Sequence, residues 1–136
     1  MRRALAAAVL GLALAGCGSP AGDLFKIDRS GQGPGAELSL LVTDDGTVRC
    51  NDEPPMAVGA ERLLEARRLA RDLSRQAALG LELPSGPRRD TTFRYRAELA
   101  EGTIAFTDTS RGAPPTFMRL AALTRRLSRD VCKLSR

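Results

Sequence analysis

The chain has 136 residues and a net charge of +5, and it contains three cysteines but no histidine. This length is enough for one domain with a hydrophobic core, and the lack of histidine excludes any catalysis or metal binding that depends on an imidazole. All but two of the 21 basic residues are arginines, a bias typical of GC-rich genomes, so we do not interpret the positive charge as a nucleic-acid-binding surface.

The first 16 residues have the layout of an export signal. Arg2 and Arg3 form a basic start, an apolar run follows over residues 4–15, and a small residue precedes Cys17. This run is too short to span a bilayer stably, because a membrane-spanning helix needs about 20 apolar residues. We therefore expect the leader to be removed from the protein.

The residues Leu14-Ala15-Gly16-Cys17 resemble the lipobox of bacterial lipoproteins. The resemblance implies that a diacylglyceryl group is attached to the Cys17 sulfur and that the chain is cut after Gly16. Two acyl chains give stable anchoring where one gives only marginal binding, so membrane lipid becomes the expected partner. The location would be the extracytoplasmic face of the cell membrane. An ordinary secretory leader with a chance cysteine is the alternative, and both interpretations place the domain in an oxidising compartment.

Cleavage before Cys17 would leave 120 residues, with 19 basic and 16 acidic side chains and hence a mild net charge of +3. Residues 17–22 consist of small residues and proline and predict a flexible tether. The rest of the chain, residues 23–136, is predicted to be a single domain.

The first part of the domain alternates apolar and polar residues and predicts strands. They cover residues 23–29, 37–43 and 47–51. The second and third strands are joined by Asp44-Asp45-Gly46, a hairpin signal because glycine takes the positive φ that a tight turn needs. Turn chemistry explains these two aspartates better than calcium binding or acid-base catalysis does.

A helix is predicted over residues 57–79, after Pro54-Pro55. Apolar residues recur there at three- and four-residue spacing and form one stripe. They are Leu63, Ala66, Ala70, Leu73 and Ala77. Gly80 suits the end of this helix.

A second hairpin and a second helix follow. Residues 91–99 alternate apolar positions with Arg94, Arg96 and Glu98, Glu101-Gly102 turns the chain, and residues 103–108 return. Pro114-Pro115 then opens a C-terminal helix. The order βββαββα predicts an α+β fold, an antiparallel sheet of about five strands with two helices packed on one face as a two-layer sandwich.

Cys50 and Cys132 are 82 positions apart. In an oxidising compartment such a pair usually forms a disulfide, here between the third strand and the last helix. A free buried pair and a redox-active pair are the alternatives. No metal site is expected, because the cysteines lack CxxC spacing and the chain lacks histidine.

Three arginines are candidate binding residues. If the apolar residues of their strands face the helices, then Arg49, Arg94 and Arg96 lie on the open face of the sheet. They would approach one another if the two hairpins adjoin, and could then bind an acidic partner or anionic lipid headgroups. The alternative is a solvated face whose charge Glu98 balances.

Several segments resemble the emfourin family of small bacterial protease inhibitors. They are FKIDRSG at residues 25–31, FRYRAEL at 93–99, GTIAFTD at 102–108 and APPTFMRLAAL at 113–123. The resemblance implies a small sheet-and-helix domain that inhibits a protease, displayed here on a membrane surface.

No motif of a known catalytic class occurs: no GxSxG serine, no HExxH and no Walker-type loop. We therefore expect no enzyme and no cofactor. The favoured interpretation is a lipid-anchored cell-envelope lipoprotein whose non-catalytic domain binds or supports another envelope protein, without nucleic acid. The alternative is an emfourin-like protease inhibitor. An enzyme would require a pocket in which carboxylates converge.

Overall fold

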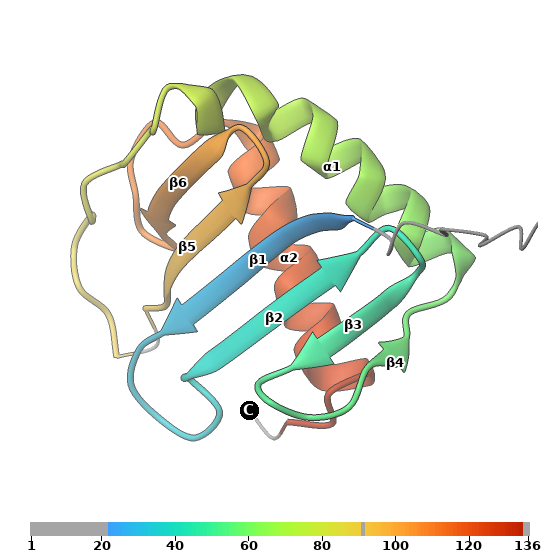
Figure 1. The fold of residues 1–136 in the computed structure, drawn as a ribbon. Coiled ribbons are helices and arrows are strands. Elements are labelled where there is room, and N and C mark those ends of the chain that lie inside the picture. Colours follow the sequence, from blue (N-terminus) through green and yellow to red (C-terminus); the bar gives the residue numbers. More distant parts are fainter. Residues whose placement is uncertain (1–21, 91, 135–136) are drawn as a thin grey trace, which may run out of the picture.

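The structure is a computed structural model that describes residues 22–90 and 92–134. It is a two-layer α+β sandwich in which one antiparallel sheet is covered on one face by two helices, as predicted (Figure 1). The strands are β1 (Asp23–Ser30), β2 (Leu38–Thr43), β3 (Thr47–Cys50), β4 (Met56–Ala57), β5 (Arg94–Leu99) and β6 (Gly102–Thr107), and the helices are α1 (Ala60–Ala78) and α2 (Pro115–Asp130). The predicted leader and its lipidation site Cys17 lie outside the described residues.

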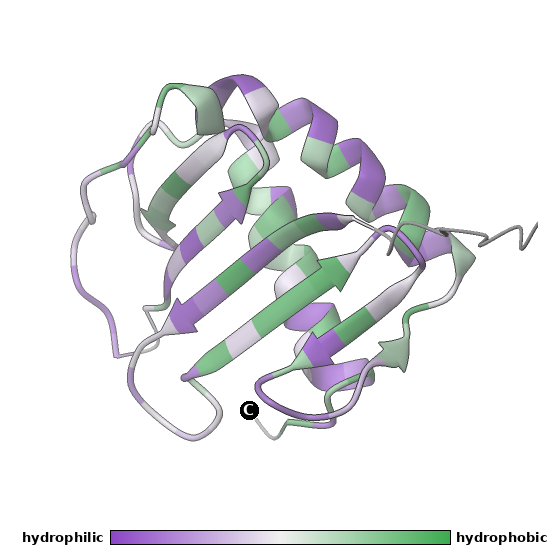
Figure 2. Cartoon of the chain, viewed as in Figure 1, coloured by the Kyte–Doolittle hydropathy of each residue, from purple (hydrophilic) through white to green (hydrophobic). Residues whose placement is uncertain are grey.

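The six strands are ordered β4-β3-β2-β1-β5-β6, so β1 separates the two hairpins. Along β1, Phe25 and Ile27 are buried against the helices, whereas Lys26 and Asp28 lie on the open face of the sheet. This alternation follows from the two-residue period of a strand, and Figure 2 shows it as alternating green and purple bands on β1 and β5.

The second hairpin forms with the predicted inward face. Tyr95 and Ala97 are buried and pair with Phe106 and Ile104 of β6. The ring centroids of Tyr95 and Phe106 are 5.1 Å apart, and that of Phe106 lies 5.0 Å from Phe117 on α2. This aromatic row joins the sheet to α2 at the centre of the core.

One short strand was not predicted, and β5 and α1 each begin three residues later than predicted. Met56–Ala57 pairs with the start of β3 as a short edge strand, and α1 begins at Ala60 rather than at residue 57. Gly59, at φ 85°, redirects the chain between these two elements. A two-residue strand has no periodicity to recognise, which is why the sequence predicted about five strands and the described residues form six.

The disulfide between Cys50 and Cys132 is present. Cys50 ends β3 and Cys132 follows the end of α2, and their Cα atoms lie 5.8 Å apart. The bond fixes the C-terminal end of α2 to the β3 side of the sheet, at the opposite side from the β5–β6 hairpin.

Helix α1 runs along the end of the sheet at which β1 begins (Figure 1). A Cβ atom on Gly46, in the β2–β3 turn, would lie 3.3 Å from the Leu63 side chain near the start of α1. A Cβ atom on Gly102, in the β5–β6 turn, would lie 2.2 Å from the Ala77 carbonyl oxygen near its end. The helix therefore extends from one hairpin turn to the other. Within the described residues, neither helix combines the length and the apolar character that crossing a membrane requires.

Candidate functional site

Two adjoining hollows lie where β1 ends. The first, of about 960 Å³, is bounded by the β1–β2 loop (residues 31–37) and by residues 85–90 and 92, which precede β5. The second, of about 660 Å³, extends over the open face of the sheet. Ser30, Glu37 and Arg94 line both hollows. We call the combined hollow the distal cleft; its charged lining includes Asp28, Glu37, Glu82, Arg88, Arg94 and Arg96.

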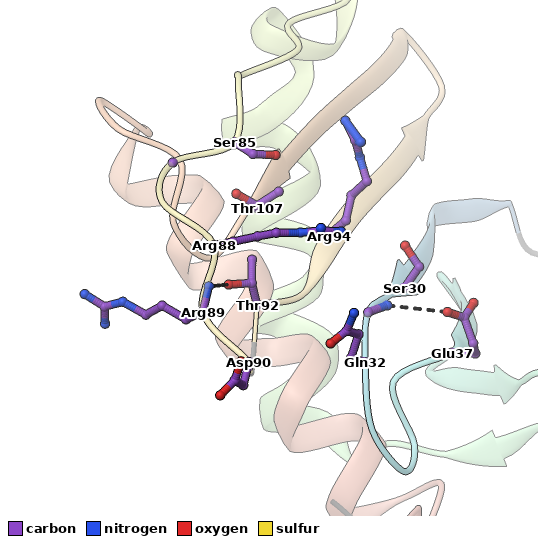
Figure 3. Close-up of a pocket in the computed structure, with 12 residues that line it drawn as sticks. Ser30, Gln32, Glu37, Ser85, Arg88, Arg89, Asp90, Thr92, Arg94 and Thr107 are labelled. Carbon is purple, nitrogen blue, oxygen red and sulfur yellow. Dashed lines mark hydrogen bonds between the residues drawn. The ribbon is translucent and has the colours of Figure 1, made fainter.

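The lining of the distal cleft carries both positive and negative side chains. Figure 3 shows the Arg88 side chain extending from its loop toward Arg94 on β5. The Arg89 side chain points away from the hollow. The Arg94 guanidinium lies 3.4 Å from the Glu82 carboxylate, an exposed ion pair of small energetic value. Across the hollow, the Glu37 carboxylate accepts a hydrogen bond of 3.4 Å from the Gly31 backbone N–H. A polar ligand would therefore meet guanidinium groups and carboxylates together, because Glu82 lies beside Arg94 and Asp90 follows Arg88 in the same loop.

The loop that forms one wall is held by a buried arginine. Arg29 is only 6% exposed, and its guanidinium donates hydrogen bonds to the Ala36 carbonyl at 3.2 Å, the Gly35 carbonyl at 2.5 Å and Ser128 Oγ at 3.4 Å. Burial lowers the pKa of Arg29, and the nearby Tyr95 and Asp108 act in the opposite direction. The side chain thus ties the β1–β2 loop to α2.

A second polar network fixes the start of β5 below the distal cleft. The Tyr95 side chain is fully buried, and its hydroxyl accepts a hydrogen bond of 3.4 Å from Arg125. Arg125 also lies 3.4 Å from the Asp108 carboxylate, which accepts a 3.0 Å hydrogen bond from the Phe93 backbone N–H. Burial, followed by the charge of Asp108, raises the pKa of Tyr95 to about 12. The phenol is therefore neutral and serves to hold the strand in place.

Of the three arginines predicted from the sequence, the structure brings two together. Arg94 and Arg96 lie on the open face of β5, and both line the distal cleft. Arg49 is on the same face, but on β3, with β2 and β1 between it and β5. Three strand spacings, about 14 Å, separate β3 from β5. The register also places Arg49 level with Glu98, so Arg94 and Arg96 lie further along the strand. The hairpins do not adjoin because β1 lies between them.

Sequence analysis did not identify Arg29 or Arg88 as site residues. Arg29 follows Phe25 and Ile27 at the next inward-facing position of β1. An arginine at a position where a strand normally buries an apolar residue could therefore have been recognised in the sequence as unusual. Arg88 lies between strands, in a segment that lacks periodicity, and the sequence held no comparable signal for it.

The side chains around the distal cleft can bind charged groups, but no catalytic arrangement is evident among them. Ser30, Ser85 and Thr92 supply hydroxyl groups, and the chain has no histidine to activate one. Across residues 22–90 and 92–134, no three acidic, cysteine or histidine side chains converge as a metal site requires. The cleft offers guanidinium donors and carboxylate acceptors for hydrogen bonds.

The chain enters the domain at the opposite end of β1 from the distal cleft. The Gly22 carbonyl accepts a 2.9 Å hydrogen bond from the Asp44 backbone N–H in the β2–β3 turn. The Arg67 side chain of α1 contacts both the carbonyl, at 2.9 Å, and the carboxylate, at 2.5 Å, of the same Asp44. The seven steps from Asp23 to Ser30 place these two ends about 23 Å apart.

Comparison of the chain with protein-family models, curated proteins and solved structures found no match. The resemblance to emfourins therefore rests on the sequence segments quoted above.

Proposed function

We propose that this protein is a bacterial lipoprotein, anchored through a diacylglyceryl group on Cys17 at the extracytoplasmic face of the cell membrane, and that its domain is a non-catalytic binding module. The main structural support is that the chain enters the domain at one end of β1 and the distal cleft lies at the other end. Gly22 is held at one end and the distal cleft lies at the other, about 23 Å away. A domain tethered through Gly22 would present the distal cleft on the side remote from its attachment.

The proposed partner of the distal cleft is a polar segment of another envelope protein that carries at least one acidic side chain. Arg88, which has no ion-pair partner among the described residues, would meet that acid, whereas Arg94 already pairs with Glu82. A charge-assisted hydrogen bond of this kind contributes about 1.5 to 3 kcal/mol. The β1–β2 loop is already ordered by Arg29, so binding would cost less conformational entropy than it would with a free loop.

Site-specific photo-crosslinking in intact cells tests this proposal. A photoreactive amino acid replaces Ser85 or Arg96 in the distal cleft, or Asp52, which is exposed between β3 and β4 outside the cleft. The proposal predicts one shared protein adduct from positions 85 and 96 and its absence from position 52. Equal adducts at all three positions, or none at 85 and 96, would contradict it.

The second candidate function is protease inhibition, and the fixed β1–β2 loop favours it. Inhibitors bind tightly when the contacting loop is already rigid, and Arg29 holds this loop at Gly35 and Ala36. The test adds the purified domain to secreted metalloproteases and follows peptide hydrolysis. Inhibition at stoichiometric amounts that is lost on replacing Gln32 and Pro34 by alanine would establish this function, and unchanged hydrolysis would remove it.

A further inference from the structure

The outer face of α1 carries three arginines between two exposed leucines. Leu64 is 50% and Leu79 is 74% exposed, and they are the exposed large hydrophobic residues of the described chain. Arg68, Arg71 and Arg75 lie between them, at spacings of three and four residues that place all five side chains on one face. We call these five residues the α1 stripe. Figure 2 shows the visible side of α1 as mainly hydrophilic, with apolar segments interspersed.

The arginines of the α1 stripe have no ion-pair partner among the described residues, whereas other charged residues of α1 do. Arg67 pairs with Asp44, Asp72 with Arg119, and Glu65 with Arg126. The acids that border the stripe are Asp72, which is already paired, and Glu61 in the first turn of the helix. The stripe therefore presents an excess of positive charge to its surroundings.

The α1 stripe lies close to the point at which the tether joins the domain. Gly22 is hydrogen-bonded to Asp44, and Asp44 is held by Arg67, the neighbour of Arg68 on α1. Six residues, 17–22, connect the proposed lipid anchor to this point, and they span at most about 20 Å when fully extended. An anchor at Cys17 would therefore keep this end of the domain near the membrane.

We propose, on the basis of the lipid anchoring proposed above, that α1 lies along the membrane surface and that the α1 stripe binds anionic phospholipid headgroups. Arginines attract the negative charge of such lipids, and exposed leucines at the two ends of the stripe can enter the headgroup region. The occupant of this face is thus a lipid surface rather than a protein. In this orientation the distal cleft points away from the bilayer.

The test couples the chain from Cys17 onward, which contains the whole described core, to maleimide lipid in vesicles through the Cys17 thiol. Since the chain has no tryptophan, Leu64→Trp and Leu79→Trp each introduce a single fluorescent reporter, and Gln32→Trp provides the matched control in the β1–β2 loop. Brominated lipids quench tryptophan that touches the bilayer. In vesicles with 30% phosphatidylglycerol, we expect quenching at positions 64 and 79 and little at position 32.

Charge reversal then identifies the surface responsible. The triple variant Arg68→Glu, Arg71→Glu and Arg75→Glu should lose the quenching at Leu79→Trp, although the protein remains coupled to the vesicle. The matched variant with glutamate at positions 49, 94 and 96 should keep it, and circular dichroism verifies that both variants are folded. Equal quenching at positions 32 and 79, or loss of quenching only in the second variant, would overturn the proposal. Because the coupling is chemical, neither result depends on whether cells lipidate Cys17.

Discussion

The guanidinium of Arg29 lies 4.8 Å from the centroid of the Phe93 ring, so a buried cation on β1 stacks on the residue that precedes β5. The same guanidinium holds the Gly35 and Ala36 carbonyls of the β1–β2 loop. One side chain therefore connects two segments that border the distal cleft.

Replacing Arg29 with methionine should lower the free energy of unfolding by about 2 kcal/mol, because hydrogen bonds from a charged donor and a cation–π contact are lost together. Urea unfolding measures this change, and amide hydrogen exchange should become faster over residues 31–37. Arg111→Met, at an exposed position, is the control and should have little effect. Unchanged exchange in the loop would show that Arg29 does not hold it.

Tyr95 should titrate at an unusually high pH. It is the only tyrosine and the chain has no tryptophan, so absorbance at 295 nm reports this phenol alone. The pKa of Tyr95 is raised to about 12 in the folded protein, against about 10 in an unfolded chain. The folded state therefore favours the neutral phenol. This contribution to the free energy of unfolding is fully present below pH 10 and is lost as the pH rises through 12.

The size of this loss follows from the two-unit difference in pKa, which corresponds to about 2.7 kcal/mol. Unfolding by urea at pH 9 and at pH 11.5 should show about 2 kcal/mol of this loss, since pH 11.5 is still below the folded-state pKa. Tyr95→Phe is the comparison that removes the ionising group. A phenol that titrates near pH 10 in the folded protein would contradict the buried network of Tyr95, Arg125 and Asp108.

The disulfide should contribute much of the stability of the domain. Closing an 82-residue loop is worth about 4.5 kcal/mol in the chain-entropy account. The double variant Cys50→Ser and Cys132→Ser should therefore unfold at a much lower urea concentration. The unreduced wild-type domain should have a mass two units below the reduced form. Two alkylatable thiols at positions 50 and 132 in the denatured, unreduced protein would contradict this link.

Gly102→Ala should be strongly destabilising. Its φ is 153°, and an added Cβ would lie 2.2 Å from the Ala77 carbonyl oxygen of α1. Gly112→Ala is the matched control, since φ there is 70° but the space around the position is open. We expect a loss of about 3 kcal/mol or more at Gly102 and about 1 kcal/mol at Gly112, measured by urea unfolding. Equal losses would show that α1 does not pack closely on the β5–β6 turn.

Much of the fold could be predicted because local periodicity determines it. The alternation around Tyr95 and the apolar spacing around Leu73 each specify an inward face. Sheet order depends instead on which strands pair in the folded chain, and nothing local in the sequence places β1 between the hairpins. The expected proximity of Arg49 to Arg94 depended on that order.

The distal cleft was harder to predict than the fold. It is formed by a loop and a connecting segment that have no regular period, and Arg88 belongs to the second of these. Arg29 occupies an inward position of β1, where sequence patterns favour apolar residues. Its burial is possible because the backbone carbonyls of the following loop accept its hydrogen bonds.

Mass spectrometry of the protein purified from the membrane fraction of cells tests the lipoprotein proposal most directly. The proposal predicts a chain that begins at Cys17, with a diacylglyceryl group on its sulfur, and a Cys17→Ser variant that carries no lipid and retains its leader. A membrane-free protein whose Cys17 is unmodified, or a mature chain that begins at another residue, would contradict it.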